Sequence, residues 1–144
     1  MSLQDRLADV LDGVLPVTRE DDGALTVHHG QTFASLRTVP VAEGLELVSL
    51  TQILAWDLPL DAKLRAQVAE HAHNTLLGTV SLAAKSAPKE VAAGAKRNSK
   101  KAADVLLRYN FPAAGLTDDA LRTLILMVLA TGSDVRRAIL SRPN

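Results

Sequence analysis

The hydrophobic pattern is densest over residues 104–130, where a strand period gives way to a helical period. Val105–Phe111 is apolar or aromatic except at Arg108 and Asn110, which is typical of a mostly buried strand. Pro112 ends this strand, because proline cannot donate a ladder hydrogen bond. A helix capped by a threonine is predicted after it. The apolar face of this helix consists of Leu121, Leu124, Ile125 and Val128.

Two further apolar residues of this helix lie outside that face. Leu126 and Met127 make the last two turns apolar nearly all round, so we expect the helix to be covered on more than one side. Two interpretations stay open: a central core helix, or a helix with one side on the sheet and the other on a second protein. Leu126 and Met127 are therefore candidate dimer or partner-interface residues. A separate short helix is predicted at about Ser133–Leu140, after Gly132.

A first helix is predicted in residues 2–15. After it, hydrophobic residues recur at every second position in the N-terminal half of the chain. The alternation predicts three strands, at Ala24–His29, Thr32–Val41 and Leu45–Leu58. Their short connections favour an antiparallel meander. By simple alternation, Trp56 shares a face with Leu50 and Leu54. Because an aromatic residue at the edge of an apolar sheet face often anchors a partner, Trp56 is also a candidate interface residue.

The remaining elements complete an α+β pattern. Asp61 is the predicted N-cap of a second helix that runs to about Asn74, and Leu76–Ala84 is the fourth strand. The predicted order is α-β-β-β-α-β-β-α plus a short C-terminal helix. Strands and helices do not alternate as in a parallel sheet, so we expect one domain, residues 1–144, with an antiparallel sheet of about five strands.

Several residues in this order resemble the YbjN family, whose fold is similar to that of type III secretion chaperones. The matching residues are His73-Asn74, Gly78–Leu82, Val105–Tyr109 with Pro112, and Gly115-Leu116-Thr117 with Leu121. The resemblance implies a homodimeric, non-catalytic protein that binds a segment of a partner protein or acts as a stress-related regulator. The segment Lys85–Lys101 departs from the family, which usually joins these two strands tightly.

The composition narrows the class of protein. Hydrophobic residues make up 47% of the chain and the formal net charge is zero, so a folded core is expected and no overall field selects nucleic acid or an anionic membrane. The chain has no cysteine, which excludes disulfides and thiolate chemistry. The N-terminal residues lack the apolar core of a signal peptide, and no apolar run is long enough to span a bilayer. We therefore expect a cytoplasmic protein without a membrane partner.

The segment Lys85–Lys101 is rich in basic residues and has no apolar period. One interpretation is a solvated, flexible insertion between the last two strands. The alternative is a nucleic-acid-associated protein that uses this loop for phosphate contacts. The candidate contact residues are Lys96, Arg97, Lys100 and Lys101. Against this alternative, the loop contains no aromatic residue on which bases could stack.

No catalytic or metal-binding motif appears in the chain. It lacks a glycine-rich phosphate loop, an HExxH motif and a nucleophile elbow. His28 and His29 are consecutive on a strand and point to opposite faces, while His71 and His73 diverge on a helix. We predict no enzymatic activity and no cofactor. A hydrolase or transferase assembled from distant segments is the third hypothesis, which a deep polar pocket would favour.

Overall fold

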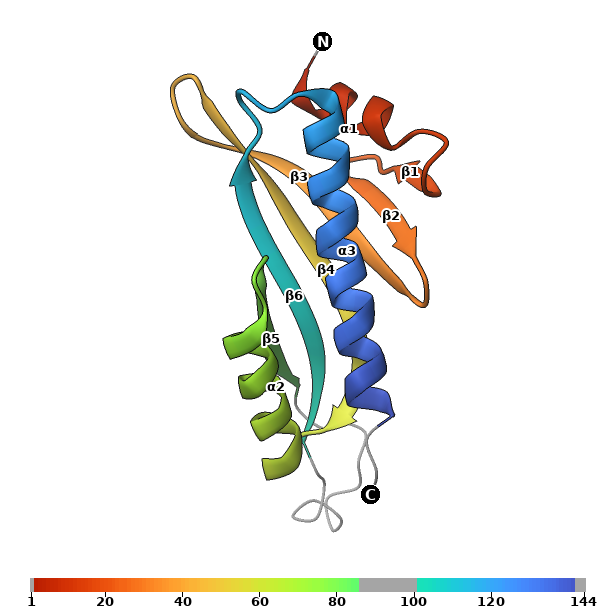
Figure 1. The fold of residues 1–144 in the computed structure, drawn as a ribbon, viewed down its shortest axis with the longest axis vertical. Helices are drawn as coiled ribbons and strands as arrows, with labels where there is room; N and C mark the ends of the chain where they lie inside the picture. The colour runs from red at the N-terminus through yellow and green to blue at the C-terminus, as the bar shows by residue number, and fades with distance from the viewer. Residues whose placement is uncertain (1, 86–100, 142–144) are drawn as a thin grey trace.

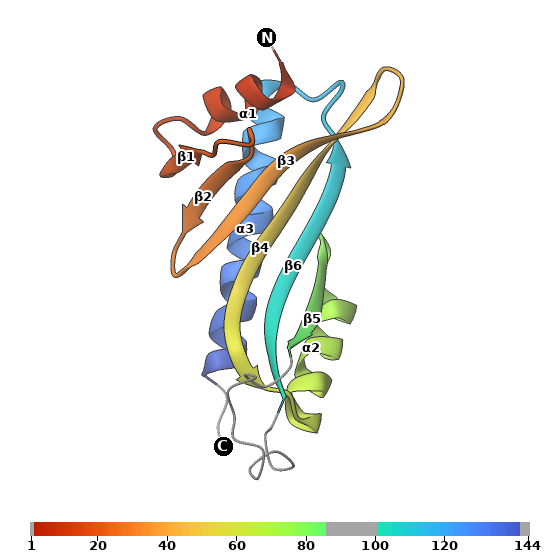
Figure 2. The same cartoon turned by 180° about the vertical axis from the view of Figure 1, so that it is seen from behind.

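The structure is a computed structural model that describes residues 2–85 and 101–141. A six-stranded antiparallel sheet carries the described helices on one face (Figure 1). α3 (Asp118–Leu140) crosses the middle of this face, α1 (Leu3–Leu11) lies at one end, and α2 (Ala62–Asn74) lies beside the sheet edge at the other. From behind, no described helix covers the opposite face (Figure 2). The predicted α+β class with an antiparallel sheet is confirmed.

The strands are arranged in the order β1-β2-β3-β4-β6-β5. Their bounds are β1 Val17–Arg19, β2 Leu25–His29, β3 Thr32–Ala42, β4 Leu45–Pro59, β5 Thr79–Lys85 and β6 Ala102–Pro112. β2, β3 and β4 form the predicted three-stranded meander, because each connection is short enough for an antiparallel neighbour, and β1 pairs with the outer side of β2. The chain then passes through α2 to the edge strand β5 and returns between β5 and β4 as β6.

Each helix begins at a side-chain cap. Ser2 accepts a hydrogen bond from the Asp5 amide at 3.0 Å, and Thr117 accepts one from the Ala120 amide at 3.0 Å. Asp61 caps α2, as the sequence predicts, by accepting from the Leu64 amide at 2.8 Å. These caps satisfy amides that have no partner within the helix, so the local sequence fixes where each helix starts.

The core lies between the helices and one face of the sheet. Alternate residues of β4 point to this side, among them Val48, Leu50 and Leu54, and all three are buried. α3 covers them with Leu121, Ile125, Val128 and Leu129, which are also buried. The helix stripe predicted from the sequence thus contacts the sheet.

The predicted break before a short C-terminal helix is wrong, because α3 is continuous from Asp118 to Leu140. Gly132 does not end the helix but lets it approach the sheet. A Cβ built on Gly132 would lie 1.9 Å from Oε1 of Gln52 on β4, closer than any side chain tolerates. The glycine is therefore explained by the close packing of α3 on β4, and the helical pattern continues through it.

A buried polar cluster accompanies this close approach. Gln52 is fully buried, and its Nε2 donates to Thr32 Oγ1 at 2.8 Å and to the Leu129 carbonyl at 3.1 Å. Ser133 Oγ lies 2.7 Å from Nδ1 of His29 on β2. These hydrogen bonds connect α3 directly to β2 and β4, and Gln52 also joins β4 to Thr32 of β3, so they fix the position of α3 along the sheet.

Two further details differ from the prediction. The sheet has six strands because β1, which is too short to show an alternating pattern, pairs with β2. Lys85 is the last residue of β5, and Lys101 directly precedes β6. The predicted flexible insertion Lys85–Lys101 therefore includes one strand residue, and its residues 86–100 lie outside the described part of the chain.

Candidate interaction surfaces

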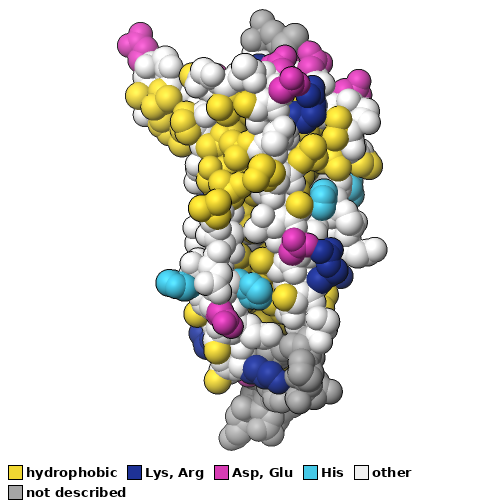
Figure 3. All heavy atoms as spheres, viewed as in Figure 1, with side chains coloured by type: hydrophobic (Ala, Val, Ile, Leu, Met, Phe, Trp, Pro, Cys, Tyr) yellow, Lys and Arg dark blue, Asp and Glu magenta, His cyan; other side chains and the backbone are white. Residues whose placement is uncertain are grey.

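The helices do not cover the whole of their face of the sheet. Figure 3 shows hydrophobic side chains gathered in the upper half of this side, over β6 and the β3–β4 hairpin. Among the exposed and half-buried hydrophobic residues of the elements around this region are Leu45, Leu76, Leu77, Tyr109, Leu124 and Met127. We call these residues the apolar patch. A patch of neighbouring apolar side chains on a small domain is a usual mark of an interaction site.

The patch is formed by residues from four parts of the chain. Tyr109 is on the helix side of β6, because it pairs with Leu50, and its ring stacks on Phe111 with centroids 5.2 Å apart. Leu124 is half-buried on α3, and Met127 is 50% exposed one turn further along. Leu76, in the α2–β5 connection, is 89% exposed. The fold thus leaves large apolar side chains in water next to the core.

β6 has a free edge beside this patch. The pairing of β5 with β6 starts at Thr79, opposite Arg108, whereas β6 continues to Pro112. Residues 109–112 therefore pair with β4 on one side and with no described strand on the other. Unpaired backbone groups at a sheet edge are a template for another extended segment.

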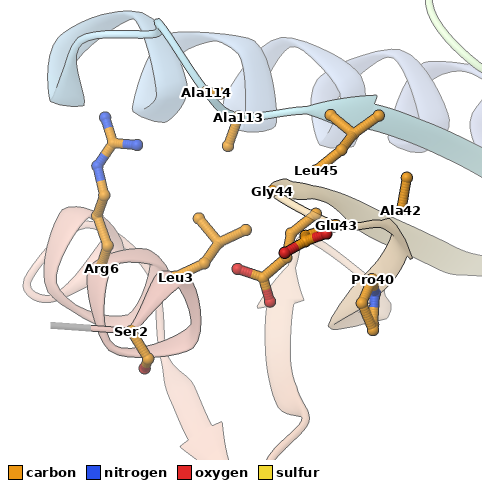
Figure 4. Close-up of a pocket in the computed structure, with 11 residues that line it drawn as sticks. Ser2, Leu3, Arg6, Pro40, Ala42, Glu43, Gly44, Leu45, Ala113 and Ala114 are labelled. Atoms are coloured by element: carbon orange, nitrogen blue, oxygen red, sulfur yellow. The ribbon is translucent and has the colours of Figure 1, made fainter.

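A groove opens at the upper end of the molecule, between α1 and the β3–β4 hairpin (Figure 4). Its volume is about 620 Å³, and Leu3 and Leu45 lie on opposite sides of it. Arg6 at its rim donates to Asp118 at 2.8 Å and to the Leu116 carbonyl. The groove continues the apolar patch at Leu45.

The helix-free face of the sheet carries a row of aromatic rings. His28 on β2 pairs with Phe33 on β3, and their ring centroids are 5.9 Å apart. The ring of Trp56 on β4 lies 5.9 Å from Phe33 on its other side. Trp56 is 50% exposed and Phe33 is 38% exposed, so the row faces solvent. Ile53 and Leu106, half-buried and paired with each other, extend it across β4 and β6.

A β-bulge turns Trp56 onto this face, so the predicted facing of Trp56 is wrong. Ile53 pairs with Leu106 whereas Ala55 pairs with Val105, so β4 has one extra residue in this interval. The alternation shifts by one, and Ala55 is buried in the core in place of Trp56. Simple alternation had placed Trp56 with Leu54, on the core side.

A carboxylate and a lysine hold the strand beyond the bulge. Asp57 has φ 53°, in the left-handed region, and its amide donates to Asp104 Oδ1 at 2.9 Å. Lys85 Nζ lies 2.7 Å from Asp57 Oδ1, 2.9 Å from Asp104 Oδ1 and 5.5 Å from the centroid of the Trp56 ring. These two carboxylates raise the pKa of Lys85 above its ordinary value, with Asp57 the larger cause. The backbone directly after Trp56 is therefore locally strained at Asp57, and the contacts of Asp104 and Lys85 hold it in place.

The structure separates the candidate interface residues predicted from the sequence. Met127 and Trp56 are exposed on opposite sides of the molecule. Leu126 is only half-exposed, and it shares a helix side with Arg122, whose Nε donates to the Val10 carbonyl of α1 at 2.8 Å. Tyr109, Leu124 and Phe33 were missed as surface residues, because the sequence marks them as apolar without telling which apolar residues remain uncovered.

Of the four candidate nucleic-acid contacts, only one is described. Lys101 is exposed, and its carbonyl accepts from the Leu60 amide at 3.1 Å. Lys96, Arg97 and Lys100 lie outside the described residues. Within the described ranges, no group of three or more His, Asp or Glu side chains is arranged to hold a metal ion. No helix of the described chain has both the length and the apolar character to cross a membrane.

Comparison with known proteins does not assign the chain to a family. The chain matches no protein-family model, and no curated protein or solved structure shows significant similarity to it. The fold and the two surfaces therefore define the protein only by class: an α+β domain whose antiparallel sheet carries its helices on one face.

Proposed function

We propose that this chain is a non-enzymatic, homodimeric protein-binding module that holds an extended apolar segment of a partner protein. The observation that carries the proposal is the apolar patch next to the free edge of β6. This arrangement supplies both parts of a segment-binding site, which are a row of backbone hydrogen-bonding groups and a place for apolar side chains.

The binding mode follows from the geometry of a strand. An extended segment that pairs with residues 109–112 projects alternate side chains to the two faces of the sheet. The side chains on the helix side meet Tyr109, Leu124 and Leu77, which are half-buried. The backbone pairing gives affinity for any extended segment, and the apolar patch selects segments with apolar residues at every second position. A chaperone-like or adaptor role in stress response is consistent with such broad selectivity.

Peptide display tests this proposal directly. Random peptides displayed on phage are selected on the immobilised full chain, and the recovered sequences are synthesised. We expect the selected peptides to carry apolar residues at every second position. We also expect slower hydrogen exchange, when such a peptide is bound, at those amides of Tyr109, Asn110 and Phe111 that point to the free edge, because they gain hydrogen-bond partners.

A pair of matched variants locates the site. Leu124→Asp introduces a charge into the apolar patch, and we expect peptide affinity to fall by about tenfold or more. Leu140→Asp makes the same change at an exposed position near the C-terminal end of α3, away from the patch, and should leave affinity unchanged. Equal loss in both variants, or peptides without an apolar period, would contradict the proposed site.

A further inference from the structure

We infer that the helix-free face of the sheet is the surface through which two copies of this chain pair, with Trp56 inside the contact. The inference rests on the proposed homodimer and assigns its surface. The apolar patch is then left for the partner segment, on the opposite side of the molecule. The dimer would thus hold two partner segments, one on the helix side of each copy.

The face has the size that a stable dimer needs. The strands β2 to β6 average about ten residues in length and are spaced about 4.8 Å apart, so this face has an area of roughly 800 Å². A standard protein interface buries about 800 Å² on each partner. Two such sheets pack face to face about 10 Å apart, which leaves room for the rings of Phe33 and Trp56 between them.

The charges on the helix-free face are balanced, which is compatible with the packing of two copies through this face. Among the described residues of this face, the cations are Arg37, Lys85 and Arg108, and the anions associated with them are Asp22, Asp57 and Asp104. These three positive and three negative charges cancel, so this described part of the face does not repel a second copy. A nucleic acid would instead require an excess of cations to neutralise its phosphates. The balance of charge therefore favours a second copy of the chain over nucleic acid as the partner of this face.

The arrangement of residues is also complementary under two-fold symmetry. Ile53 and Leu106 are paired neighbours on this face, and along the strands they lie between Arg108 on one side and Trp56 and Asp57 on the other. Arg108 lies two residues beyond Leu106 on β6. A two-fold axis that passes between Ile53 and Leu106 places Arg108 of each copy over Trp56 and Asp57 of the other copy. Arg108 is exposed and has no ion pair with any described residue, whereas the Asp57 side chain is 69% exposed. The axis brings the free guanidinium of each copy to the ring and carboxylate of the other.

The single tryptophan of the chain makes the contact measurable without a label. Diluting the protein from high to low micromolar concentration should shift Trp56 emission to longer wavelength, because the ring passes from an apolar contact into water. Sedimentation over the same range should show the mass fall from two chains to one, at the same midpoint. A dimer that dissociates without any change in Trp56 emission would overturn the inference.

Charge variants test the symmetric pairing. Arg108→Asp places a carboxylate against Asp57 of the other copy, and the dissociation constant of the dimer should rise by about ten- to a hundredfold. Adding Asp57→Asn to Arg108→Asp removes the like charge and should recover part of that loss. Circular dichroism checks that both variants are folded, as expected for exposed positions.

Variants of the apolar patch distinguish this inference from the proposed function. Met127→Asp should leave the dimer intact and weaken peptide binding only. If Met127→Asp dissociates the dimer and Arg108→Asp does not, the helix side is the dimer surface and the inference is wrong. If the wild-type chain is a monomer but binds single-stranded DNA with quenching of Trp56, the face is a nucleic-acid platform and the inference is also wrong, while the peptide site is tested separately by Leu124→Asp.

Discussion

At the scale of single residues, Gly132 has the most restricted position in α3. Gln52 Oε1 lies where a side chain would begin, and it has no hydrogen-bond partner among the described residues. One Cα hydrogen of Gly132 therefore points at this oxygen, which is the geometry of a weak C–H···O contact. The glycine both permits the packing and partly satisfies a buried acceptor.

We expect Gly132→Ala to destabilise the protein by about 2–3 kcal/mol, although alanine is the better helix former by about 1 kcal/mol. The new methyl group forces Gln52 away from Thr32 and from the Leu129 carbonyl, and these hydrogen bonds are lost. Urea denaturation of the two proteins measures the difference.

A double-mutant cycle with Gln52→Ala identifies the cause. Removing the Gln52 side chain removes the clash, so Gly132→Ala should then cost far less and approach the gain expected from helix propensity. An equal cost in both backgrounds would mean that the glycine has another role than making room for Gln52.

Single residues also show where the sequence stops being informative. Trp56 is exposed, as a candidate interface residue has to be, but the face on which it lies depends on the bulge between Ile53 and Ala55. A second register shift follows between Ala55 and Leu58, where the Asp57 amide donates to Asp104, 47 residues further along the chain. A local pattern cannot contain such a contact, and this is why the aromatic row appears only in the folded chain.

At the scale of elements, local signals were the reliable ones. Ser2, Asp61 and Thr117 all cap the helices that the sequence predicts for them, because capping needs only neighbouring residues. The predicted end of the helix at Gly132 failed for the opposite reason, since a strand from the other half of the chain determines that glycine. The uncovered apolar patch depends in the same way on how three helices share one sheet face.

Ion pairs attach the N-terminal elements to the rest of the fold. Asp5 of α1 accepts from Arg19 of β1 at 2.9 Å, and Asp22 pairs with Arg37 of β3 at 2.9 Å. The hydrogen bond from Arg19 lowers the pKa of Asp5 below 3.8, and the Ala24 amide followed by Arg37 lowers that of Asp22 below 3.8. Each folded-state pKa lies below the unfolded value, so each contribution to stability is present above pH 3.8 and is lost as the pH falls through the folded value.

We therefore expect the free energy of unfolding to decrease between about pH 5 and pH 2, and to decrease less steeply in an Asp5→Asn/Asp22→Asn variant. Thermal unfolding across this range measures both slopes. Because these pairs are exposed, high salt should reduce the difference between the slopes. A variant with an unchanged slope at low salt would show that these carboxylates do not contribute.

At the scale of the whole molecule, the segment between β5 and β6 joins two strands that are already paired with each other. Lys85 and Ala102 are paired across antiparallel strands, so two residues are enough to join them. We expect replacement of residues 86–101 by Asn-Gly to preserve the structure and to raise stability by about 1–2 kcal/mol, since a shorter loop costs less entropy to close. Calorimetry and circular dichroism check both points.

The shortened chain also tests the nucleic-acid alternative, because Lys96, Arg97, Lys100 and Lys101 are removed together. If the intact chain binds single-stranded DNA and the shortened chain does not, the segment carries that function. Loss of the fold on shortening would instead show that residues 86–101 are needed for the pairing of β5 with β6.

The order of strands in the sheet also has a consequence for how the protein is made. β6 occupies the place between β4 and β5, yet it is the last strand to leave the ribosome. Until it arrives, the 15-residue strand β4 has an open edge and β5 has no neighbour to join. We therefore expect nascent chains that are halted before Ala102 to expose the apolar face of β4 and to aggregate more readily than the full chain.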